Sequence, residues 1–464
     1  MTNRRDFLKL SAFSLGSIGL FNNLHQSAIA MTDPDDYKSL VVVNLNGGND
    51  SLNMLIPNTT TEFNQYYQAR SNIAFERNSL LPITPEGLTS NSFALSPRMR
   101  EVRNLFNSGD LSFVANVGSL IEPITKTAFL DPSRSQALPE GLGGHNTQAA
   151  YWQADHSNGI NTSRDGWGGR LANEFNANGV LPTNISINSG HTVMQSHAIQ
   201  RFYNVGLGGL ISLRDFRGEA NNPETRARRK ALNALNQQAM NSNDPFLKHA
   251  GQIFNDGLEL NLTLQNSLTN ISQNFSDRFP DPVSFSGGAF SEGLARVAEL
   301  ISIRRQLNMK RQIFFVELAG FDTHSDHVEN HGNLSEDLSN FLKAFNDIIN
   351  DNDELRNSVV TVTTSEFGRN LASNGDGTDH AWGAQHIVMG GPINGGKIFG
   401  SFPSLELDGS DDYNGLGRMI PTLSVSQYGA TVAKWFGVPE QDMQNVFPNI
   451  INYSQAERDI GFIS

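Results

Sequence analysis

The sequence contains no cysteine in its 464 residues. Disulfide bonds, thiolate metal sites, iron–sulfur clusters and a cysteine nucleophile are therefore excluded. Charged residues are also sparse at 17%, and acidic residues outnumber basic ones by 47 to 34. An acidic surface argues against general binding to nucleic acid or anionic membranes, although a local cationic site for an anion stays compatible with it. The low charge and frequent Gly, Asn and Ser are typical of an extracytoplasmic protein with many loops.

Long hydrophobic runs are missing after the N-terminus, where no segment reaches about eighteen apolar residues. We therefore expect a soluble mature protein without stable membrane insertion. The first thirty residues differ, because Arg4-Arg5 precede an apolar stretch over 8–21 and Ala28-Ile29-Ala30 forms a small-residue cleavage site. This segment resembles a twin-arginine export signal, which predicts a signal peptide over 1–30 and a periplasmic or secreted protein. A membrane anchor or a short buried helix is the alternative.

Short apolar runs alternate with helical periodicity along the rest of the chain, 31–464. This alternation predicts an α/β fold: one three-layer α/β/α sandwich around a mostly parallel sheet. The stretch 223–269 predicts two long helices separated at Pro245, as a helical insertion at about 220–275. The predicted strands are 39–45, 111–117, 184–187, 312–318, 358–364 and 386–389; the other predicted helices are 96–106, 290–307, 334–349 and 425–436.

Carboxylate and imidazole side chains follow successive predicted strands. Asp50, Asp322, Glu366 and His380 all fall at or near strand ends. If these strands are parallel neighbours, the four side chains gather at one edge of the sheet, where a cation would offset their repulsion. A mixed Asp/Glu/His set suits zinc, manganese or a similar divalent ion. Singly, each residue is also compatible with a helix cap, a turn or a solvated side chain.

Three segments carry a family resemblance: VVVNLNGGNDSLNMLIP, FVELAGFDTHSDH and TTSEFGRNLASNGDGTDHAWGAQHIVMGGPINGGKIFG. They resemble a bacterial family of twin-arginine-exported proteins of unknown function within the alkaline phosphatase-like superfamily, which includes sulfatases, phosphatases and phosphodiesterases. The resemblance runs from about Leu40 to Pro439. It implies an alkaline phosphatase-like sandwich that hydrolyses phosphate or sulfate esters on two divalent metals, with a Ser, Thr or formylglycine nucleophile.

The resemblance also implies roles for individual residues. Its metal ligands are Asp50 from the first strand, Asp322 and His324 from an Asp-Thr-His pattern, Glu366, and His380 with His386 as a nearby alternative. The metal would be Zn, Mn or Ca, of unknown number. His327 and His331, four residues apart, either share an exposed helix face or replace one of these ligands.

Several positions depart from the family pattern. Phe367 stands where the superfamily has a histidine, which implies a weakened or empty second metal site. Gly144 occupies the serine position of a Ser-His-Asn-x-Gln segment, so Thr147 and Ser51 stay as alternative nucleophiles. Leu130 occupies the nucleophile position of a fragment similar to the sulfatase signature, and without cysteine no cysteine-derived formylglycine can form.

If the protein is an enzyme, Arg369 is placed to hold phosphate or sulfate through its planar fork. A structural salt bridge is the alternative for Arg369, and His145 is a candidate general base, ligand or substrate contact. Attack would come from Thr147, Ser51 or activated water. The competing class is a non-catalytic secreted binding or assembly protein that retains the fold. Its partners would be glycans or proteins, whereas the enzyme would take an anionic ester or glycan substrate.

Overall fold

The computed structural model describes residues 36–155, 165–175, 181–188, 203–207, 222–269, 271 and 273–464. The predicted signal peptide over 1–30 lies outside the described residues, so its export function stays a prediction. Over the described part of the chain, no helix combines the length and apolar character required to cross a membrane.

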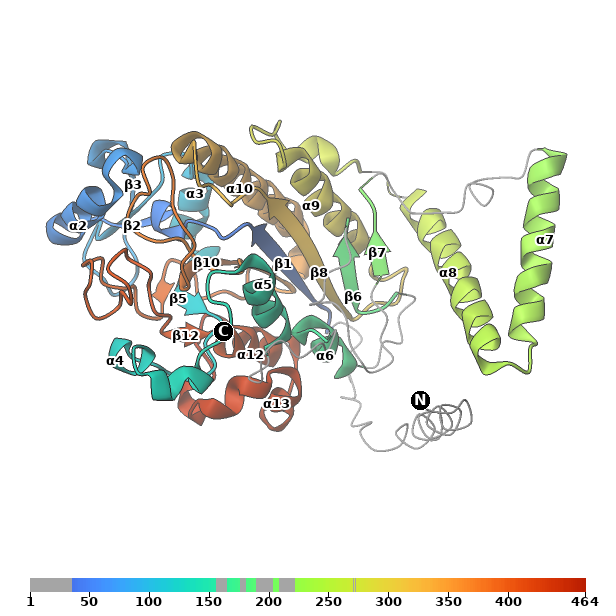
Figure 1. Ribbon diagram of the computed structural model, residues 1–464. Helices are drawn as coiled ribbons and strands as arrows, with labels where there is room; N and C mark the ends of the chain where they lie inside the picture. The colour runs from blue at the N-terminus through green and yellow to red at the C-terminus, as the bar shows by residue number, and fades with distance from the viewer. Residues whose placement is uncertain are drawn as a thin grey trace.

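A mixed, mostly parallel sheet forms the centre of the protein (Figure 1). Its strands follow the order β11-β5-β10-β9-β1-β8-β6-β7, and β12 pairs with β5 outside this path. β10 runs antiparallel to both of its neighbours, and the other pairs in this sheet are parallel. The strands are β1 Lys38–Asn46, β5 Leu111–Gly118, β6 Asn184–Ile187, β7 Tyr203–Val205, β8 Arg311–Ala319, β9 Val359–Thr364, β10 Ala384–Met389, β11 Ile398–Phe399 and β12 Leu423–Ser424.

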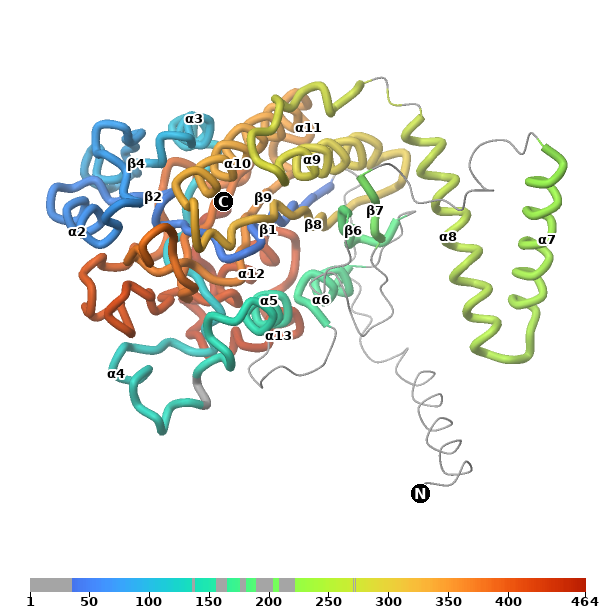
Figure 2. Tube along the Cα trace, turned by 45° about the horizontal axis from the view of Figure 1, so that its top comes forward, coloured from blue at the N-terminus to red at the C-terminus, as the bar shows by residue number. Residues whose placement is uncertain are grey.

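Helices cover both faces of this sheet, as Figures 1 and 2 show. One hydrophobic cluster joins β1 and β8 to α3, α9 and α10, and a second joins the opposite sheet face to α6, α12 and α13. The mixed α/β architecture with a mostly parallel sheet is therefore confirmed. The helices are α2 Thr60–Arg70, α3 Arg100–Ser108, α4 Lys126–Phe129, α5 His145–Ala154, α6 Trp167–Asn173, α7 Pro223–Met240, α8 Pro245–Thr269, α9 Gly287–Ser302, α10 His327–Asn350, α11 Asp353–Arg356, α12 Val425–Phe436 and α13 Met443–Val446.

Residues along β1 alternate between the two cores. Val41, Val43 and Leu45 belong to the cluster with α10, whereas Leu40 and Val42 belong to the cluster with α12. This is the period of two that a pleated strand imposes. The same period places Asn44 and Asn46 on the face of Val42, and both residues line a cavity there together with Val42.

Some element boundaries differ from the sequence prediction. Helix α10 begins at His327 instead of residue 334, which brings His327 and His331 into a buried helix face. The expectation that these two histidines share an exposed face is therefore wrong. Apolar periodicity could not reveal this first turn, because its buried side chains are polar. A small antiparallel sheet of β2 Leu55–Pro57, β3 Leu81–Ile83 and β4 Phe93–Leu95 was also not predicted.

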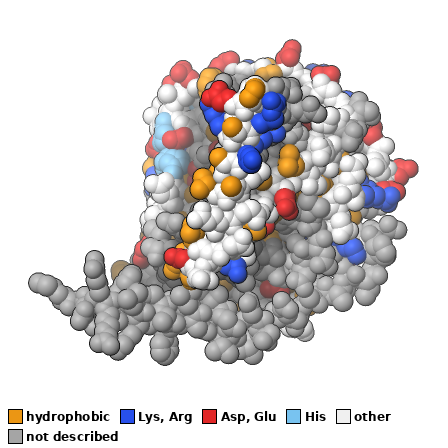
Figure 3. Space-filling view, turned by 90° about the vertical axis from the view of Figure 1, so that its right-hand side faces the viewer, with side chains coloured by type: hydrophobic (Ala, Val, Ile, Leu, Met, Phe, Trp, Pro, Cys, Tyr) orange, Lys and Arg blue, Asp and Glu red, His pale blue; other side chains and the backbone are white. Residues whose placement is uncertain are grey.

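The predicted helical insertion forms a hairpin of α7 and α8 that projects from the rest of the molecule (Figures 1 and 2). Leu264 of α8 is buried in the core, whereas Leu235 and Phe246 are exposed. In Figure 3 hydrophobic side chains run along this side of the molecule, with basic side chains near one end. The hairpin lies away from the candidate site described next.

Candidate functional site

Two loops, one after β8 and one between β9 and β10, and one helix end bring the site residues to one edge of the main sheet. Asp322 and His324 follow β8, Glu366 and Arg369 follow β9, and His145 is the first residue of α5. His380 precedes β10, and because β10 runs antiparallel to β9, the start of β10 lies beside the end of β9. The antiparallel strand thus explains why a residue before a strand joins residues that follow strands.

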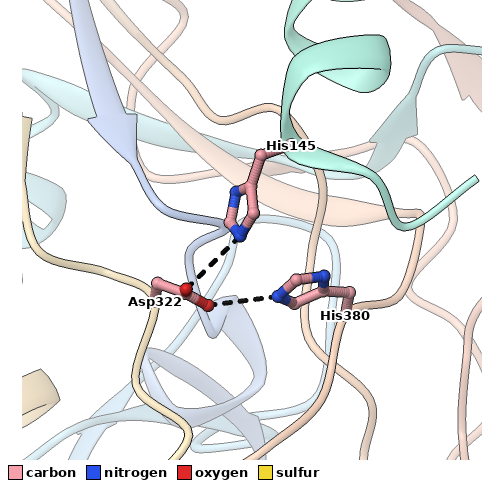
Figure 4. A group of neighbouring side chains, drawn as sticks. All are labelled: His145, Asp322 and His380. Carbon is pink, nitrogen blue, oxygen red and sulfur yellow. Dashed lines mark hydrogen bonds and ion pairs between the residues drawn. The ribbon is translucent and has the colours of Figure 1, made fainter.

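His145, Asp322 and His380 form a group whose ligand atoms all lie within 4.8 Å of one another. Figure 4 shows both imidazole rings pointing toward the Asp322 carboxylate. Nε2 of His145 lies 3.4 Å from Oδ2 of Asp322, and Nε2 of His380 lies 3.1 Å from Oδ1. Nε2 of His324 also lies 3.1 Å from Oδ1 of Asp322. Three imidazoles therefore approach one carboxylate, each through the same ring atom.

The opposite nitrogen of each ring faces an acceptor. Nδ1 of His145 lies 2.9 Å from Oε1 of Glu366, and Nδ1 of His380 lies 2.6 Å from the carbonyl oxygen of Gly143. Nδ1 of His324 lies 3.2 Å from Oδ1 of Asp379. A carbonyl oxygen can only accept, so His380 donates from Nδ1, and the same tautomer satisfies the other two contacts. The lone pair on Nε2 of each ring then faces the Asp322 carboxylate, which has no proton to donate, and that of His324 also accepts from Nη1 of Arg369 at 3.4 Å.

Arg369 is almost fully buried and supplies a fixed positive charge beside this group. Its Nη2 donates to Oδ1 of Asp322 at 2.7 Å and to the carbonyl oxygen of Phe321 at 3.2 Å. Partial burial raises the pKa of Asp322, but the positive charge of Arg369 and the imidazoles around the carboxylate outweigh it and leave the pKa below its ordinary value. Arg369 therefore forms the salt bridge that was its alternative role, and Asp322 occupies part of its guanidinium group.

Phe367 packs against both of the histidines that flank Asp322, whose rings also contact each other. Its ring centroid lies 4.9 Å from that of His145 and 4.6 Å from that of His380. Gly48, with φ of +81°, lies against this ring, and a Cβ at that position would approach the ring to 2.1 Å. An apolar side chain thus holds both imidazoles in place where the resemblance had implied another metal-binding histidine.

Asp50 does not join the group around Asp322. Its carboxylate receives two hydrogen bonds from the guanidinium of Arg70, at 2.7 and 2.6 Å, and lies 2.9 Å from Nε2 of His327. Burial raises the pKa of Asp50, but Arg70 and His327 outweigh that effect and hold it well below its ordinary range. Asp50 therefore lies outside the Asp322 group, with both oxygens in a buried ion pair, and its expected role as a metal ligand stays a prediction that the structure does not support.

The neighbouring histidines of α10 belong to the same buried network. Nδ1 of His327 lies 2.7 Å from the hydroxyl of Thr323, and Nε2 of His331 lies 3.1 Å from Oδ1 of Asn49. Burial lowers the pKa of His331 to about 3, so this ring is neutral at pH 7. His327 and His331 therefore do not replace a ligand of the Asp322 group; they support the loop that carries it.

His386 lies within β10 and points into the core. Its ring packs against Trp152 and Tyr428, with centroid distances of 4.9 and 5.6 Å. Neither ring nitrogen has a hydrogen-bond partner among the described residues, and burial lowers its pKa to about 3. The alternative that His386 is the late metal ligand is corrected: the pleat of β10 turns its side chain away from the site.

The two nucleophile candidates have engaged hydroxyl groups. Thr147 donates to the carbonyl oxygens of Gly141 and Gly144, at 2.8 and 2.9 Å, within the loop and first turn of α5. Ser51 accepts a hydrogen bond from the backbone N–H of Gln385 at 2.9 Å. The hydroxyl proton of Thr147 thus serves local structure, and Ser51 is only 2% exposed, so neither hydroxyl is presented to a substrate at Asp322.

Sequence reasoning missed the outer partners of the histidines and the polar side chains of the adjacent cavity. Asp379 neighbours His380 in the sequence but was not selected. Asn44 and Glu317 interrupt otherwise apolar strands, where a polar residue is unexpected in a sheet that is covered on both faces. Such interruptions are the sequence signal that would have identified the cavity.

The site's donor set fits a divalent metal ion. Imidazole nitrogen and carboxylate oxygen are ligands of zinc and manganese, and metal-bound histidines commonly donate their other N–H to a carboxylate or a carbonyl. His145 and His380 with Asp322 would hold the ion, and His324 is the nearest further donor. Glu366 would not bind the ion directly, because its contact with the centre is a hydrogen bond to Nδ1 of His145. The candidate metal site is inferred from this orientation, in which Nε2 of each ring faces Asp322 and Nδ1 faces another acceptor.

Fold and site together define a mixed α/β protein with a candidate metal centre at one edge of its central sheet. The chain belongs to the family described as "Protein of unknown function (DUF1501)", whose model matches residues 37–414. None of the curated proteins compared with the sequence matches it.

Solved structures give weak similarities. One is the "Crystal structure of Ps i-CgsB in complex with k-i-k-neocarrahexaose", which is 12% identical, with a TM-score of 0.34, over 91% of this chain and 77% of that chain. Another, the "Crystal structure of Ps i-CgsB", is 13% identical with the same TM-score, over 90% of this chain and 77% of that chain.

These findings correct the family assignment made from sequence motifs. The matching family is described only as one of unknown function, and its model begins at residue 37, after the proposed export signal. TM-scores of 0.34 are too low to give the fold a superfamily name. The identification with a family of the alkaline phosphatase-like superfamily is therefore wrong, since the family shown is described only as one of unknown function, whereas export through residues 1–30 stays a separate, untested prediction.

Proposed function

We propose that the protein is an exported hydrolase of phosphate or sulfate esters that uses a divalent metal ion bound by His145, Asp322 and His380. The observation that carries this proposal is the common orientation of three imidazoles. Each directs Nε2 toward Asp322 while Nδ1 faces Glu366, Gly143 or Asp379. Without a cation, such an arrangement contributes little to the stability of the folded protein, because it concentrates nitrogen lone pairs around a carboxylate. When a cation is bound, the same lone pairs and carboxylate interact favourably with its charge.

A bound divalent ion would lower the pKa of water and offset negative charge on the transferring group. Water is the proposed nucleophile, since the hydroxyls of Thr147 and Ser51 are engaged elsewhere. Glu366 positions His145 through Nδ1, and Gly143 positions His380 in the same way. Arg369 keeps Asp322 oriented and adds positive charge near the oxyanion.

The test combines metal binding with a substrate panel. Purified protein is titrated with Zn²⁺, Mn²⁺ and Ca²⁺ by calorimetry and assayed with p-nitrophenyl phosphate, bis(p-nitrophenyl) phosphate and p-nitrophenyl sulfate. We expect saturable binding of at least one ion and hydrolysis of at least one ester that stops on chelation. Absence of binding by all three ions would overturn the proposed metal centre.

A second function has its own supporting observation. Since neither candidate hydroxyl is free, a protein that binds metal and an external partner without turnover also fits the site. Retained metal binding with no hydrolysis of any ester in the panel would favour this function. Hydrolysis that depends on Asp322 would exclude it.

Export is the remaining part of the proposal and is supported by the sequence of residues 1–30. Expression of the full chain should give mature protein outside the cytoplasm, and N-terminal sequencing should locate the start after Ala30. A chain without residues 1–30 should stay in the cytoplasm. Equal distribution of both chains would contradict export through this segment.

A further inference from the structure

A cavity of about 350 Å³ lies next to the candidate metal centre and shares Glu366 with it. Its walls come from β1, β8 and β9 on one side and from α5 and the start of α6 on the other. Small-molecule sites in proteins occupy roughly 300–1,000 Å³, so the cavity suits a small organic group. Apart from Glu366, none of its side chains belongs to the metal centre.

The floor of the cavity is a row of polar side chains across three parallel strands. Asn44 of β1 is in register with Glu317 of β8 and Thr364 of β9. Thr364 donates to Oδ1 of Asn44 at 3.2 Å, and Nδ2 of Asn44 donates to Oε2 of Glu317 at 3.3 Å. Strands in a sheet covered on both faces are ordinarily apolar here, so this ordered polar row indicates a polar ligand.

Two tryptophans form part of the opposite wall. Trp152 and Trp167 both line the cavity and are 4% and 5% exposed. The indole nitrogen of Trp152 has no hydrogen-bond partner among the described residues. That nitrogen has almost no accessible surface, so Trp152 contributes an aromatic ring to the wall and no hydrogen bond to a ligand. Aromatic rings also pack well against the C–H faces of a ligand.

The charge of the cavity excludes an anionic group. Glu317 and Glu366 line it, and the lining residues that the structure describes include no Lys, Arg or His. Carboxylates and amides bind hydroxyl groups well, because together they accept and donate hydrogen bonds. The cavity is thus suited to a neutral molecule with several hydroxyls and an apolar face.

We propose that this cavity binds a sugar ring, the neutral part of a glycan ester whose phosphate or sulfate group lies at the metal centre. This inference rests on the proposed function, and it names the substrate class of the same site. Glu366 joins the two parts, since it borders the cavity and holds His145 through Oε1. The ester bond would then lie at the boundary between the polar row and the three imidazoles.

The test measures sugar binding apart from catalysis. Methyl galactopyranoside, methyl glucopyranoside and methyl mannopyranoside are titrated into the full mature protein, with and without chelator, by calorimetry and tryptophan fluorescence. We expect at least one glycoside to bind saturably in both conditions. Binding should weaken at least tenfold in Trp152→Phe, which replaces the indole in the wall by a smaller ring, and in Glu317→Gln. Trp435→Phe on α12, a tryptophan outside the cavity lining, is the matched control and should bind as the wild type does.

Failure of every glycoside to bind, or wild-type affinity in both cavity variants, would overturn the proposal. Circular dichroism and thermal melting establish that each variant is folded, and Glu317→Gln covers the case in which Trp152→Phe does not fold. Because chelator is present in one arm, loss of the metal function and loss of the sugar site are distinguishable. Glycoside binding without any metal binding would leave the sugar site intact and reject only the proposed hydrolase.

Discussion

Nε2 of His324 lies 3.0 Å from Nε2 of His380, and both atoms lie 3.1 Å from Oδ1 of Asp322. With Nδ1 of His380 donating to a carbonyl oxygen, two imidazoles and a carboxylate share a space in which lone pairs face one another. A proton or a metal ion between them converts this repulsion into attraction. Replacing the candidate ligands, or the residues that hydrogen-bond to them, therefore tests whether a metal ion binds here.

Replacing a ligand should abolish metal binding without unfolding the protein. We expect His380→Gln and Asp322→Asn to lower Zn²⁺ affinity by more than the roughly 10–100-fold that loss of an outer partner costs. Calorimetric titration measures the affinity, and His249→Gln on the exposed surface of α8 serves as the control. Unchanged Zn²⁺ affinity in both ligand variants would reject the site.

Loss of a residue that hydrogen-bonds to a metal-binding histidine should lower metal affinity less than loss of a ligand, but by a measurable amount. Asp379 accepts from Nδ1 of His324, so Asp379→Ala frees that ring to rotate and to change tautomer. We expect a loss of roughly tenfold in metal affinity, at the lower end of such effects, because Asp379 is partly exposed. Asp353→Ala, at the exposed start of α11, should leave the affinity unchanged. Equal affinities for Asp379→Ala and the wild type would show that Asp379 does not orient His324.

Asp50 should affect stability and not metal binding. Asp50→Asn leaves the guanidinium of Arg70 buried with no charge partner, which typically costs about 3–5 kcal/mol of unfolding free energy. Glu224→Gln, which disrupts an exposed pair with Arg228, should cost less than about 1 kcal/mol. Urea unfolding measures both variants, and calorimetry of the folded Asp50→Asn protein should give wild-type metal affinity. A selective loss of metal affinity would restore Asp50 as a ligand.

Much of the fold followed from the sequence because its signals are local. The runs at 39–45 and 312–318 are mostly apolar, and the helices at 223–269 and 425–436 carry clear periodicity with Pro or Gly at their ends. The start of α10 was missed because His327 and His331 are buried polar residues that belong to a network with Asp50 and Asn49. Such networks depend on contacts between distant segments, which periodicity does not encode.

The candidate site was partly predictable for the same reason. That residues after strand ends meet at one edge follows from parallel topology, which accounts for Asp322, whereas His380 joins it because β10 runs antiparallel. The exclusion of Asp50 was not predictable, because it depends on Arg70 of α2 reaching the carboxylate. Likewise, whether His386 faced the site or the core depended on the pleat of β10, and one residue of register reverses that choice.

His386 also gives a prediction about pH. Burial lowers its pKa to about 3 in the folded protein, against an ordinary value of 6.5. Between these values the unfolded chain binds a proton that the folded protein does not, so this residue removes stability as the pH falls below about 6.5. At 1.4 kcal/mol per pH unit, the loss reaches about 2–3 kcal/mol by pH 4.5.

Replacement of His386 by leucine removes that proton and keeps an apolar side chain between Trp152 and Tyr428. We expect unfolding free energies measured in urea at pH 7, 6, 5 and 4.5 to fall less steeply for His386→Leu than for the wild type. The unfolding free energy of the variant relative to that of the wild type should therefore rise toward acid pH, since the variant lacks the penalty. His249→Gln changes an exposed histidine and should give a curve parallel to that of the wild type. If His386→Leu also runs parallel, the folded protein protonates His386 as readily as the unfolded chain does, and the ring must have access to water.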